Sequence, residues 1–258
     1  MTEQTWSQPI TKIEPNKVWI RGYRLDELMG EAPFSHVVYL VLKGELPSEA
    51  EGRVMDAILV ASVDHGSTPP SAMAARTVAS TGAPLTTGIA AGLMSINQYH
   101  GGAIEGCMRV LHDGVARHQE TGQAMAEVAR EIVAEHRAAK RRLPGFGHRI
   151  HTDDPRVARL FALADETGLA GPHVAMAHAI RRALQKVLGK SLPLNVDGGI
   201  AALLCEMDFP PEMANGFFAM SRVVGLTAHV FDELVNQRPM RHISATAQAY
   251  NGPEERSL

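Results

Sequence analysis

The chain has 258 residues, of which 45% are hydrophobic and 21% charged, proportions typical of a globular protein with a sizeable core. Its 25 Lys and Arg against 28 Asp and Glu give a formal net charge of −3, without the basic excess that indicates a nucleic-acid partner. Two cysteines are too few for a disulfide scaffold. Only 5% of the residues are aromatic and 12 are Met, which favours a helical core of small and flexible aliphatic side chains.

The sequence start and the apolar stretches bear on where the protein works. Residues 1–12 contain no basic segment followed by an apolar run, so we expect no secretory signal. No apolar stretch approaches the roughly 20 residues that span a bilayer. We therefore expect a cytoplasmic protein without a membrane partner.

Helical periodicity dominates the chain from residue 34 onward. Residues 34–42 form the first predicted helix, which ends with Gly44 as a C-terminal cap. Ser48 and Glu51 form a predicted capping box at the start of the next helix. Further helices are predicted at residues 71–80, 85–97, 120–142, 157–167, 174–188, 198–207 and 211–236. Strand signals are weak, at residues 18–20 and near Ile150, so the sequence predicts an all-α fold.

Two of these predicted helices differ in character. Residues 120–142 carry a run of charges and are expected to form one long exposed helix. Residues 85–97 are apolar on nearly every side, which is typical of a helix inside the core. An interface between two subunits would present the same pattern, so this alternative stays open.

Four islands of polar residues and glycines interrupt the helices. They occupy residues 63–66, 98–103, 145–156 and 195–199. Glycine lets the backbone approach a ligand closely, and imidazole titrates near physiological pH. A single such histidine is most simply a helix-capping or turn residue. Together, His65, His100, His148 and Asp197 favour a functional site.

Several kinds of site are disfavoured by the residue patterns. No His-Glu-x-x-His motif or pair of neighbouring cysteines occurs, so we expect no metal site. No Gly-x-x-x-x-Gly-Lys phosphate loop occurs either. Cys107 and Cys205 lie in apolar helical contexts, where a buried and inert thiol is expected.

Several histidines with one carboxylate and two or three arginines suit one class of reaction. A carboxylate base can remove a proton alpha to a thioester carbonyl if an imidazole hydrogen-bonds the developing enolate oxygen. A second imidazole can move the proton of a carbonyl or carbinol oxygen. Arginines bind the carboxylates of a di- or tri-acid. This chemistry makes or breaks a carbon–carbon bond and requires no metal.

The order and composition of the islands resemble the citrate synthase superfamily, over about residues 21 to 252. The resemblance implies an all-α fold with a large domain (1–105 and 221–258) and a smaller mobile domain (106–220). The matching segments are Arg21-Gly22-Tyr23, Gly44-Glu45-Leu46-Pro47, Asp64-His65-Gly66 with Ala75-Arg76, His100-Gly101-Gly102, Gly145-Phe146-Gly147-His148-Arg149 with Asp154-Pro155-Arg156, Asn195-Val196-Asp197, and Phe218-Ala219-Met220-Ser221-Arg222 with Ala228-His229.

The resemblance also implies a role for each matching residue. Asp197 would exchange the proton of the acetyl methyl group, His100 would stabilise the enolate oxygen, and His148 would handle the hydroxyl or keto proton. The residues that would bind substrate are His65, Arg156, Arg222 and Arg238. The backbone that would contact the coenzyme A adenine is that of Pro144, Gly145, Phe146 and Gly147. Coenzyme A would then be part of the substrate, with no tightly bound cofactor.

The chain departs from a full-length citrate synthase in two places. Only 16 residues separate Pro47 from Asp64, and short members of the superfamily include the citryl-CoA lyases. The family's C-terminal carboxylate-binding arginine has two possible alignments. One keeps Arg238, with Arg241 as a spare, and the other places Ala245 there and removes the arginine.

The resemblance and the short chain together predict a citryl-CoA lyase-like enzyme that cleaves (3S)-citryl-CoA to acetyl-CoA and oxaloacetate. A synthase that condenses an acyl-CoA with a 2-oxo acid, citrate or methylcitrate synthase-like, is the alternative within the same chemistry. A catalytically silent acyl-CoA-binding protein is the alternative of another class. The resemblance further implies a homodimer or higher homo-oligomer.

Overall fold

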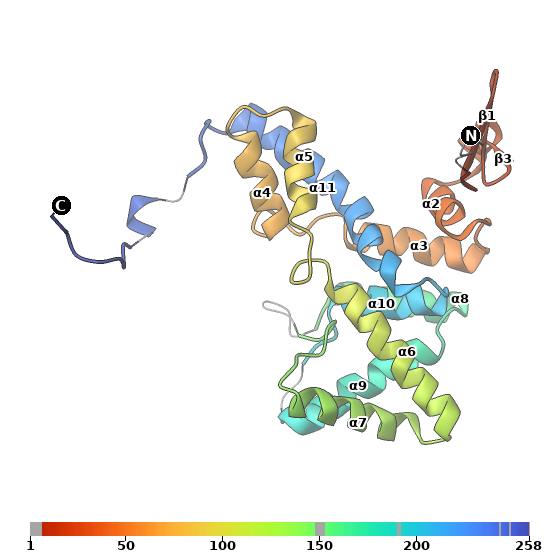
Figure 1. Ribbon diagram of the computed structural model, residues 1–258. Helices are drawn as coiled ribbons and strands as arrows, with labels where there is room; N and C mark the ends of the chain where they lie inside the picture. Colours follow the sequence, from red (N-terminus) through yellow and green to blue (C-terminus); the bar gives the residue numbers. More distant parts are fainter. Residues whose placement is uncertain (1–6, 148–152, 190–191, 243, 248, 258) are drawn as a thin grey trace, which may run out of the picture. The chain divides into compact units, whose positions relative to one another are not determined.

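The structure is a computed structural model that describes residues 7–147, 153–189, 192–242, 244–247 and 249–257. Within these residues nearly all regular structure is helical, which confirms the all-α prediction (Figure 1). The α-helices are α1 (Leu25–Glu31), α2 (Phe34–Lys43), α3 (Glu49–Ala61), α4 (Pro70–Ala79), α5 (Leu85–Met94), α6 (Ala103–Thr121), α7 (Met125–Ala138), α8 (Pro155–Thr167), α9 (Pro172–Leu188), α10 (Val196–Glu206) and α11 (Ala214–Asn236). Two short 3-10 helices, at Pro211–Met213 and Ala245–Ala247, complete the helical elements.

A small antiparallel sheet precedes the helices. It consists of β1 (Thr11–Glu14), β2 (Lys17–Ile20) and β3 (Tyr23–Arg24), in the order β1-β2-β3. The predicted strand at residues 18–20 is therefore confirmed as part of β2. The strand signal near Ile150 lies outside the described residues.

The helix-terminating signals in the sequence are confirmed where the structure describes them. Gly44 ends α2 in the left-handed region with φ 97°, and Ser48 and Glu51 form both hydrogen bonds of the capping box at the start of α3. The predicted helix at 120–142 is wrong in its extent. Gly122, at φ 70°, ends α6, and α7 begins three residues later. No helix in the described ranges has both the length and the apolar character needed to cross a bilayer.

The chain divides into two compact units. Unit 1 comprises Met1–Val63 and Asn97–Ser221, and unit 2 comprises Asp64–Ile96 and Arg222–Leu258. The predicted large and small domains differ from these units, because their boundaries lie at residues 105 and 220. They are also defined differently, as two parts that move relative to each other. That division stays a prediction.

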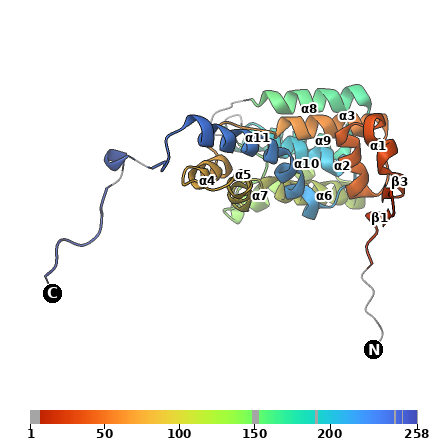
Figure 2. The same ribbon diagram turned by 90° about the horizontal axis from the view of Figure 1, so that it is seen from above.

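Helix α10 is the central helix of unit 1. It packs against α6, α8 and α9, as both ribbon views show (Figures 1 and 2). Nine of its eleven residues are buried, so its whole circumference is covered. Because the helix has almost no exposed face, its two ends hold the polar groups that can meet a ligand.

Unit 2 is built from α4, α5 and the C-terminal part of α11. Its buried cluster consists of Ala75, Ala79, Leu226 and Val230, with side chains of α5 packed against it. The expectation that residues 85–97 lie inside the core is wrong for this chain. Among the residues of α5 only the two glycines that face α4 and α11, Gly88 and Gly92, are buried. The apolar side chains packed against the cluster are only half-buried, and Met94 is exposed.

Candidate active site

The predicted base, Asp197, lies in the first turn of α10. Asn195 caps this helix, with its side-chain oxygen accepting a hydrogen bond from the Gly198 N–H at 3.1 Å. Asp197 is half-buried, and the unpaired N–H groups at a helix N-terminus favour a negative charge there. The N-terminal turn of α10 therefore holds the Asp197 carboxylate in a fixed position on a buried helix.

The predicted coenzyme A loop is held against the segment that precedes Asp197. The Asn195 side-chain amide donates to the Gly147 carbonyl at 2.8 Å, and the Asn195 N–H donates to the Gly145 carbonyl at 3.0 Å. A third hydrogen bond runs from the Gly147 N–H to the carbonyl of Pro193 at 2.7 Å. The structure thus brings together two islands that lie about 50 residues apart in the sequence, and Asn195 is the residue that joins them.

Close backbone contacts explain why glycines occur in both segments. A side chain on Gly198 would place its Cβ 2.5 Å from the Gly145 carbonyl oxygen, and one on Gly145 would place its Cβ 2.7 Å from the sulfur of Cys107 on α6. Gly145 also has φ 83°, which a residue with a side chain rarely adopts. The loop is therefore packed directly onto the N-terminal ends of α6 and α10.

Both cysteines are free and buried, as predicted. Burial, with the nearby Asp197 carboxylate as a second cause, raises the pKa of Cys107 to about 12. Burial also raises the pKa of Cys205. A thiol with a raised pKa is a poor nucleophile at neutral pH, so neither cysteine suits nucleophilic catalysis.

His100 precedes α6 in a tight loop. Its backbone exchanges two hydrogen bonds with Asn97, at 2.8 and 2.9 Å, and its ring meets that of Phe218 on α11 edge to face, with 5.6 Å between the ring centroids. Phe218 is buried and His100 is half-buried. The backbone and the ring contact together fix the position of this imidazole near the start of α6.

Arg156 begins α8 beside the residue that caps the helix. The Asp154 carboxylate accepts from the Arg156 Nε at 3.0 Å and from its Nη2 at 2.8 Å. The Asp154 side chain has no exposed surface, whereas that of Arg156 is 22% exposed. The buried carboxylate therefore orients the guanidinium. The sequence motif alone did not reveal this contact.

In unit 2, Asp64 connects the segment of His65 to α11. Its carboxylate accepts from the Gly66 N–H at 2.9 Å and lies 3.0 Å from Nε2 of His229. Burial tends to raise the pKa of Asp64, but these two contacts outweigh it, so the pKa lies below its ordinary value. His65 itself is exposed, in the turn that Asp64 stabilises. Two matching segments 165 residues apart are thus joined by one carboxylate–imidazole contact.

The predicted arginines of unit 2 lie in different surroundings. Arg222 on α11 is buried, whereas Arg238, just beyond the end of this helix, is exposed. Arg241 forms a two-point ion pair with Glu233, at 2.8 and 2.6 Å, and Arg76 contacts the same carboxylate at 2.8 Å. Because Arg241 is bound to Glu233, Arg238 is the better candidate of the two for an outer substrate carboxylate.

The predicted site residues therefore fall into two groups, one in each unit. His100, Arg156, Asp197 and the loop from Pro144 to Gly147 belong to unit 1, and His65, Arg222 and Arg238 belong to unit 2. His148 lies outside the described residues. Asn195, Asp154 and Glu233 are partners that the sequence analysis gave no role of their own, although Asn195 stands at a recognisable N-cap position before a helix.

The helical fold and the positions of these polar segments at helix ends can be compared with known protein families. Residues 48–243 match the family model of the citrate synthase C-terminal domain. The chain belongs to the citrate synthase family.

The relatives of this chain include both short and long proteins. Citryl-CoA lyase from Hydrogenobacter thermophilus has 41% sequence identity and a TM-score of 0.90, over 99% of this chain and 98% of that chain. Citrate synthase from Thermoplasma acidophilum, solved as a ternary complex with carboxymethyl coenzyme A and oxaloacetate, has 25% identity and a TM-score of 0.70, over 88% of this chain and 59% of that chain. Citrate synthase 2 of Bacillus subtilis is 29% identical over 84% of this chain and 55% of that protein. The chain thus spans about half the length of the curated relatives it matches.

Proposed function

We propose that this chain is a citryl-CoA lyase-like enzyme that cleaves (3S)-citryl-CoA into acetyl-CoA and oxaloacetate. The observation that carries the proposal is the similarity to a citryl-CoA lyase across nearly the whole length of both chains. The curated citrate synthases, by contrast, extend well beyond the matched region. The short internal spacing of 16 residues between Pro47 and Asp64 supports the same choice.

The proposed reaction breaks the bond between the thioester α-carbon and the carbinol carbon. His148 accepts the proton of the carbinol hydroxyl, and the electrons of its O–H bond form the keto group of oxaloacetate. The electron pair of the broken carbon–carbon bond forms the enolate of acetyl-CoA, whose oxygen accepts a hydrogen bond from His100. Asp197, which carries a proton when citryl-CoA is bound, then delivers that proton to the enolate carbon and gives the methyl group. After product release, His148 loses its proton to solvent and Asp197 takes one up, which restores both groups.

Binding is assigned to the remaining site residues. Arg156, Arg222 and Arg238 hold substrate carboxylates through paired hydrogen bonds, and His65 holds the hydroxyl or keto oxygen. The backbone of residues 144–147 holds the adenine of coenzyme A, which enters as part of the substrate. The hydrogen bonds from Asn195 to this loop support the assignment, because they keep the proposed nucleotide site beside the turn that bears Asp197.

A coupled assay tests the lyase activity. Purified protein is incubated with (3S)-citryl-CoA, malate dehydrogenase and NADH, so that released oxaloacetate is measured as NADH oxidation. We expect turnover that depends on the protein concentration. The absence of oxaloacetate at high protein concentration would sink the citrate version of the proposal.

A synthase remains the second candidate, because the curated relatives carry that name and because the same catalytic residues serve both directions of one reaction. Acetyl-CoA or propionyl-CoA is mixed with oxaloacetate, and the free thiol of coenzyme A is measured. Thiol release faster than citryl-CoA cleavage would favour the synthase. A catalytically silent acyl-CoA-binding protein would show neither activity.

The substitution Asp197→Asn separates an enzyme from a binding protein. General acid–base catalysis contributes about 10²- to 10⁴-fold, so we expect the cleavage rate to fall by that factor. The affinity for the coenzyme A ester, measured by calorimetry, should change little. Glu127→Gln is the matched control, since Glu127 also lies in the first turn of a helix but is exposed on α7. Equal rates for Asp197→Asn and Glu127→Gln would contradict the role of Asp197.

We also propose that the protein works as a homodimer or a higher homo-oligomer in the cytoplasm. Exposed apolar side chains on α11, among them Val224, Phe231 and Val235, support the assembly, because large exposed apolar groups at helical spacing are typical of an interface. Two free thiols fit a reducing compartment.

A further inference from the structure

A second cluster of side chains with ligand chemistry lies in unit 1, away from the candidate active site. His112 on α6, His173 on α9 and Cys205 on α10 each offer one nitrogen or sulfur atom, and these three atoms lie within 4.8 Å of one another. The two imidazole rings meet edge to face with 4.9 Å between their centroids. Cys205 is near the end of α10, about 12 Å along the helix from Asp197, so the cluster is distinct from the proposed catalytic groups.

Glu206 fixes which nitrogen of His173 can bind a metal ion. The Glu206 carboxylate lies 3.0 Å from Nδ1 of His173 and also accepts from the backbone N–H groups of Gly171 and Val174, at 2.9 Å each. A carboxylate only accepts hydrogen bonds, so this contact favours the tautomer of a neutral imidazole with the proton on Nδ1 and the lone pair on Nε2. A carboxylate behind the imidazole is the arrangement that orients histidine ligands in metal sites.

The other two groups also suit a metal ligand. The His112 imidazole offers a nitrogen ligand from α6, beside the ring of His173. The sulfur of Cys205 is buried and lies 3.8 Å from the Met108 carbonyl, a weak contact that a stronger partner can replace. The side chains of both histidines are only half-buried, so an ion can reach the cluster from solvent.

We propose that His112, His173 and Cys205 bind a Zn²⁺ ion, with Glu206 positioning His173. Two imidazoles and a thiolate suit a borderline-soft ion, whereas Ca²⁺ and Mg²⁺ require oxygen ligands. Zn²⁺ displaces the thiol proton of Cys205 to solvent, forms a zinc–sulfur bond, and takes a water molecule as its fourth ligand. The ion joins three helices that pack around one another and so stabilises the support of Asp197 without entering the reaction.

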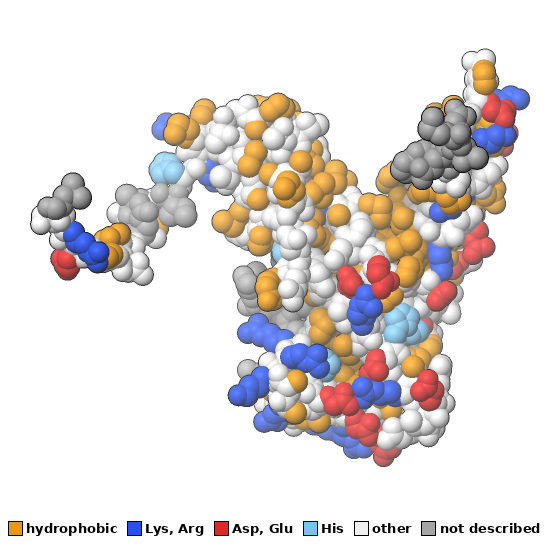
Figure 3. Space-filling model, viewed as in Figure 1, with side chains coloured by type: hydrophobic (Ala, Val, Ile, Leu, Met, Phe, Trp, Pro, Cys, Tyr) orange, Lys and Arg blue, Asp and Glu red, His pale blue; other side chains and the backbone are white. Residues whose placement is uncertain are grey.

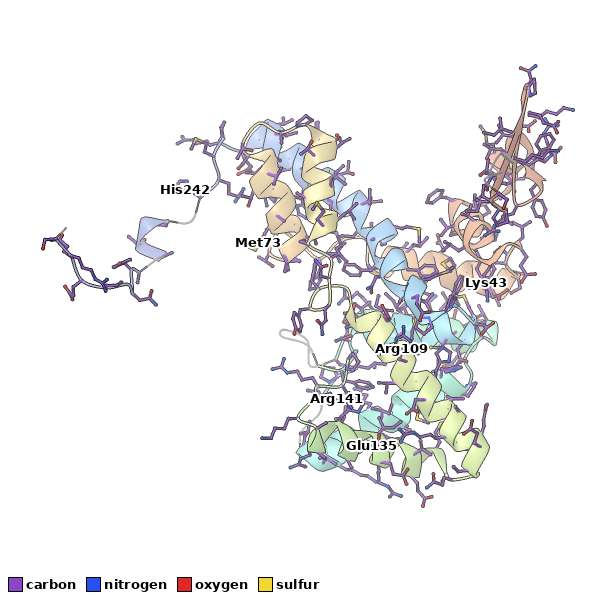
Figure 4. The ribbon with its side chains drawn as sticks, in the orientation of Figure 1. Lys43, Met73, Arg109, Glu135, Arg141 and His242 are labelled. Atoms are coloured by element: carbon purple, nitrogen blue, oxygen red, sulfur yellow. The ribbon has the colours of Figure 1, made fainter. Side chains whose placement is uncertain are left out.

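This proposal departs from the sequence-based expectation of no metal site. That expectation rested on motifs whose ligands are close in the sequence. These three ligands, by contrast, lie on three separate helices. The cluster lies one turn beyond Arg109 on α6, which is labelled in Figure 4 and pairs with Glu105 and Glu212. Only the tertiary packing of α6, α9 and α10 brings the ligands together.

The test titrates chelator-treated full-length protein with Co²⁺, a spectroscopic substitute for Zn²⁺, and then with Zn²⁺. We expect one equivalent of Co²⁺ to bind with a thiolate-to-cobalt charge-transfer band, and one equivalent of Zn²⁺ to abolish that band. Cys205→Ala should lose the band, whereas the matched control Cys107→Ala should keep it. Failure to bind, or a band that survives Cys205→Ala, overturns the proposal.

Further variants keep the test decisive if Cys205→Ala does not fold. His173→Gln should lose binding, and His178→Gln on the same helix should not. Glu206→Gln should weaken Zn²⁺ affinity by about 10- to 100-fold, as removal of a supporting carboxylate commonly does. Zn²⁺ should also raise the melting temperature of the wild type but not that of His173→Gln. Equal affinities for His173→Gln and His178→Gln would mean that these side chains are packing residues only.

Discussion

The two units hold their candidate site residues by different means. In unit 1, Asp197 and the loop around Gly145 are fixed by backbone hydrogen bonds and close glycine contacts on a helix that is buried on all sides. In unit 2, the described buried cluster is small, and ion pairs join Arg76 on α4 and Arg241 to the buried Glu233 carboxylate on α11. Close backbone packing therefore fixes the turn that bears Asp197 in unit 1, whereas a network of buried charge fixes the end of α11 in unit 2.

The surfaces of the units show the same contrast. Apolar side chains are widespread over α4, α5 and α11 in the space-filling view, whereas acidic and basic side chains alternate over α6 and α7 (Figure 3). Met94 on α5 is 80% exposed and Phe231 on α11 is 60% exposed. Burying such groups contributes about 1.5 to 3 kcal/mol each. An assembly that covers this face would therefore stabilise unit 2.

The largest effect is expected when a charged residue is introduced into the apolar surface of unit 2. Phe231→Asp would place an unpaired carboxylate in the proposed subunit interface, so we expect dimers to dissociate into monomers and citryl-CoA cleavage to fall sharply. Light scattering coupled to size-exclusion chromatography measures the mass. Phe34→Asp is the matched control, since Phe34 is a phenylalanine of unit 1 that is 80% exposed, and its replacement should leave the mass unchanged. A Phe231→Asp protein that stays dimeric would place the interface elsewhere.

A smaller effect is expected from one methyl group in unit 1. Gly198→Ala would place a Cβ 2.5 Å from the Gly145 carbonyl oxygen. Because this oxygen belongs to the backbone, it cannot move aside as the end of a flexible side chain can. We expect a loss of about 2 to 3 kcal/mol in the free energy of unfolding, together with slower cleavage because Asp197 shifts.

The matched control for this change is another helical glycine. Gly216 on α11 has no atom within 4 Å of an added Cβ, so Gly216→Ala should stabilise the protein by about 0.5 to 1 kcal/mol. Urea unfolding measures both variants. Equal effects of the two substitutions would show that the contact between Gly198 and Gly145 does not constrain the fold.

Local features of the fold were predictable from the sequence because local physics decides them. Gly44 ends a helix and Ser48 with Glu51 starts one through contacts within a few residues. The all-α fold follows from the periodicity of the whole chain. Helix α6 was missed except for its last two residues, and Gly122 was placed inside one predicted helix at 120–142, because the charges there suggested a continuous exposed helix.

Long-range partners were not predictable in the same way. The motif around Arg156 indicated a carboxylate-binding arginine but not that buried Asp154 orients it. The contact of Glu233 with Arg76 joins residues 157 positions apart, which no periodicity reveals. The apolar character of α5 was evident from the sequence. Its exposure depends on how many helices pack around it, and that number cannot be read from the sequence of one helix.

The smallest of the expected effects concerns the charge network of unit 2. Burial tends to raise the pKa of Glu233, but Arg241 and Arg76 outweigh it, and the pKa lies below its ordinary value. A carboxylate with a lowered pKa stabilises the fold at a pH above the ordinary glutamate value of about 4.3, and this contribution is lost as the pH falls through the lowered pKa. Glu233→Gln should cost about 2 kcal/mol at pH 7, because the side chain is fully buried while Arg241 is partly exposed.

The pH dependence makes this prediction specific to charge. Urea unfolding at a series of pH values should show the stabilities of wild type and Glu233→Gln converging as the pH falls below about 4, since protonated Glu233 resembles glutamine. Glu135→Gln in unit 1 is the control, because the Glu135 side chain is 50% exposed in its pair with Arg117 (Figure 4). That exposed pair should contribute less than about 1 kcal/mol, and salt should screen it. A constant difference between wild type and Glu233→Gln at every pH would mean that packing, rather than charge, holds the arginines of unit 2.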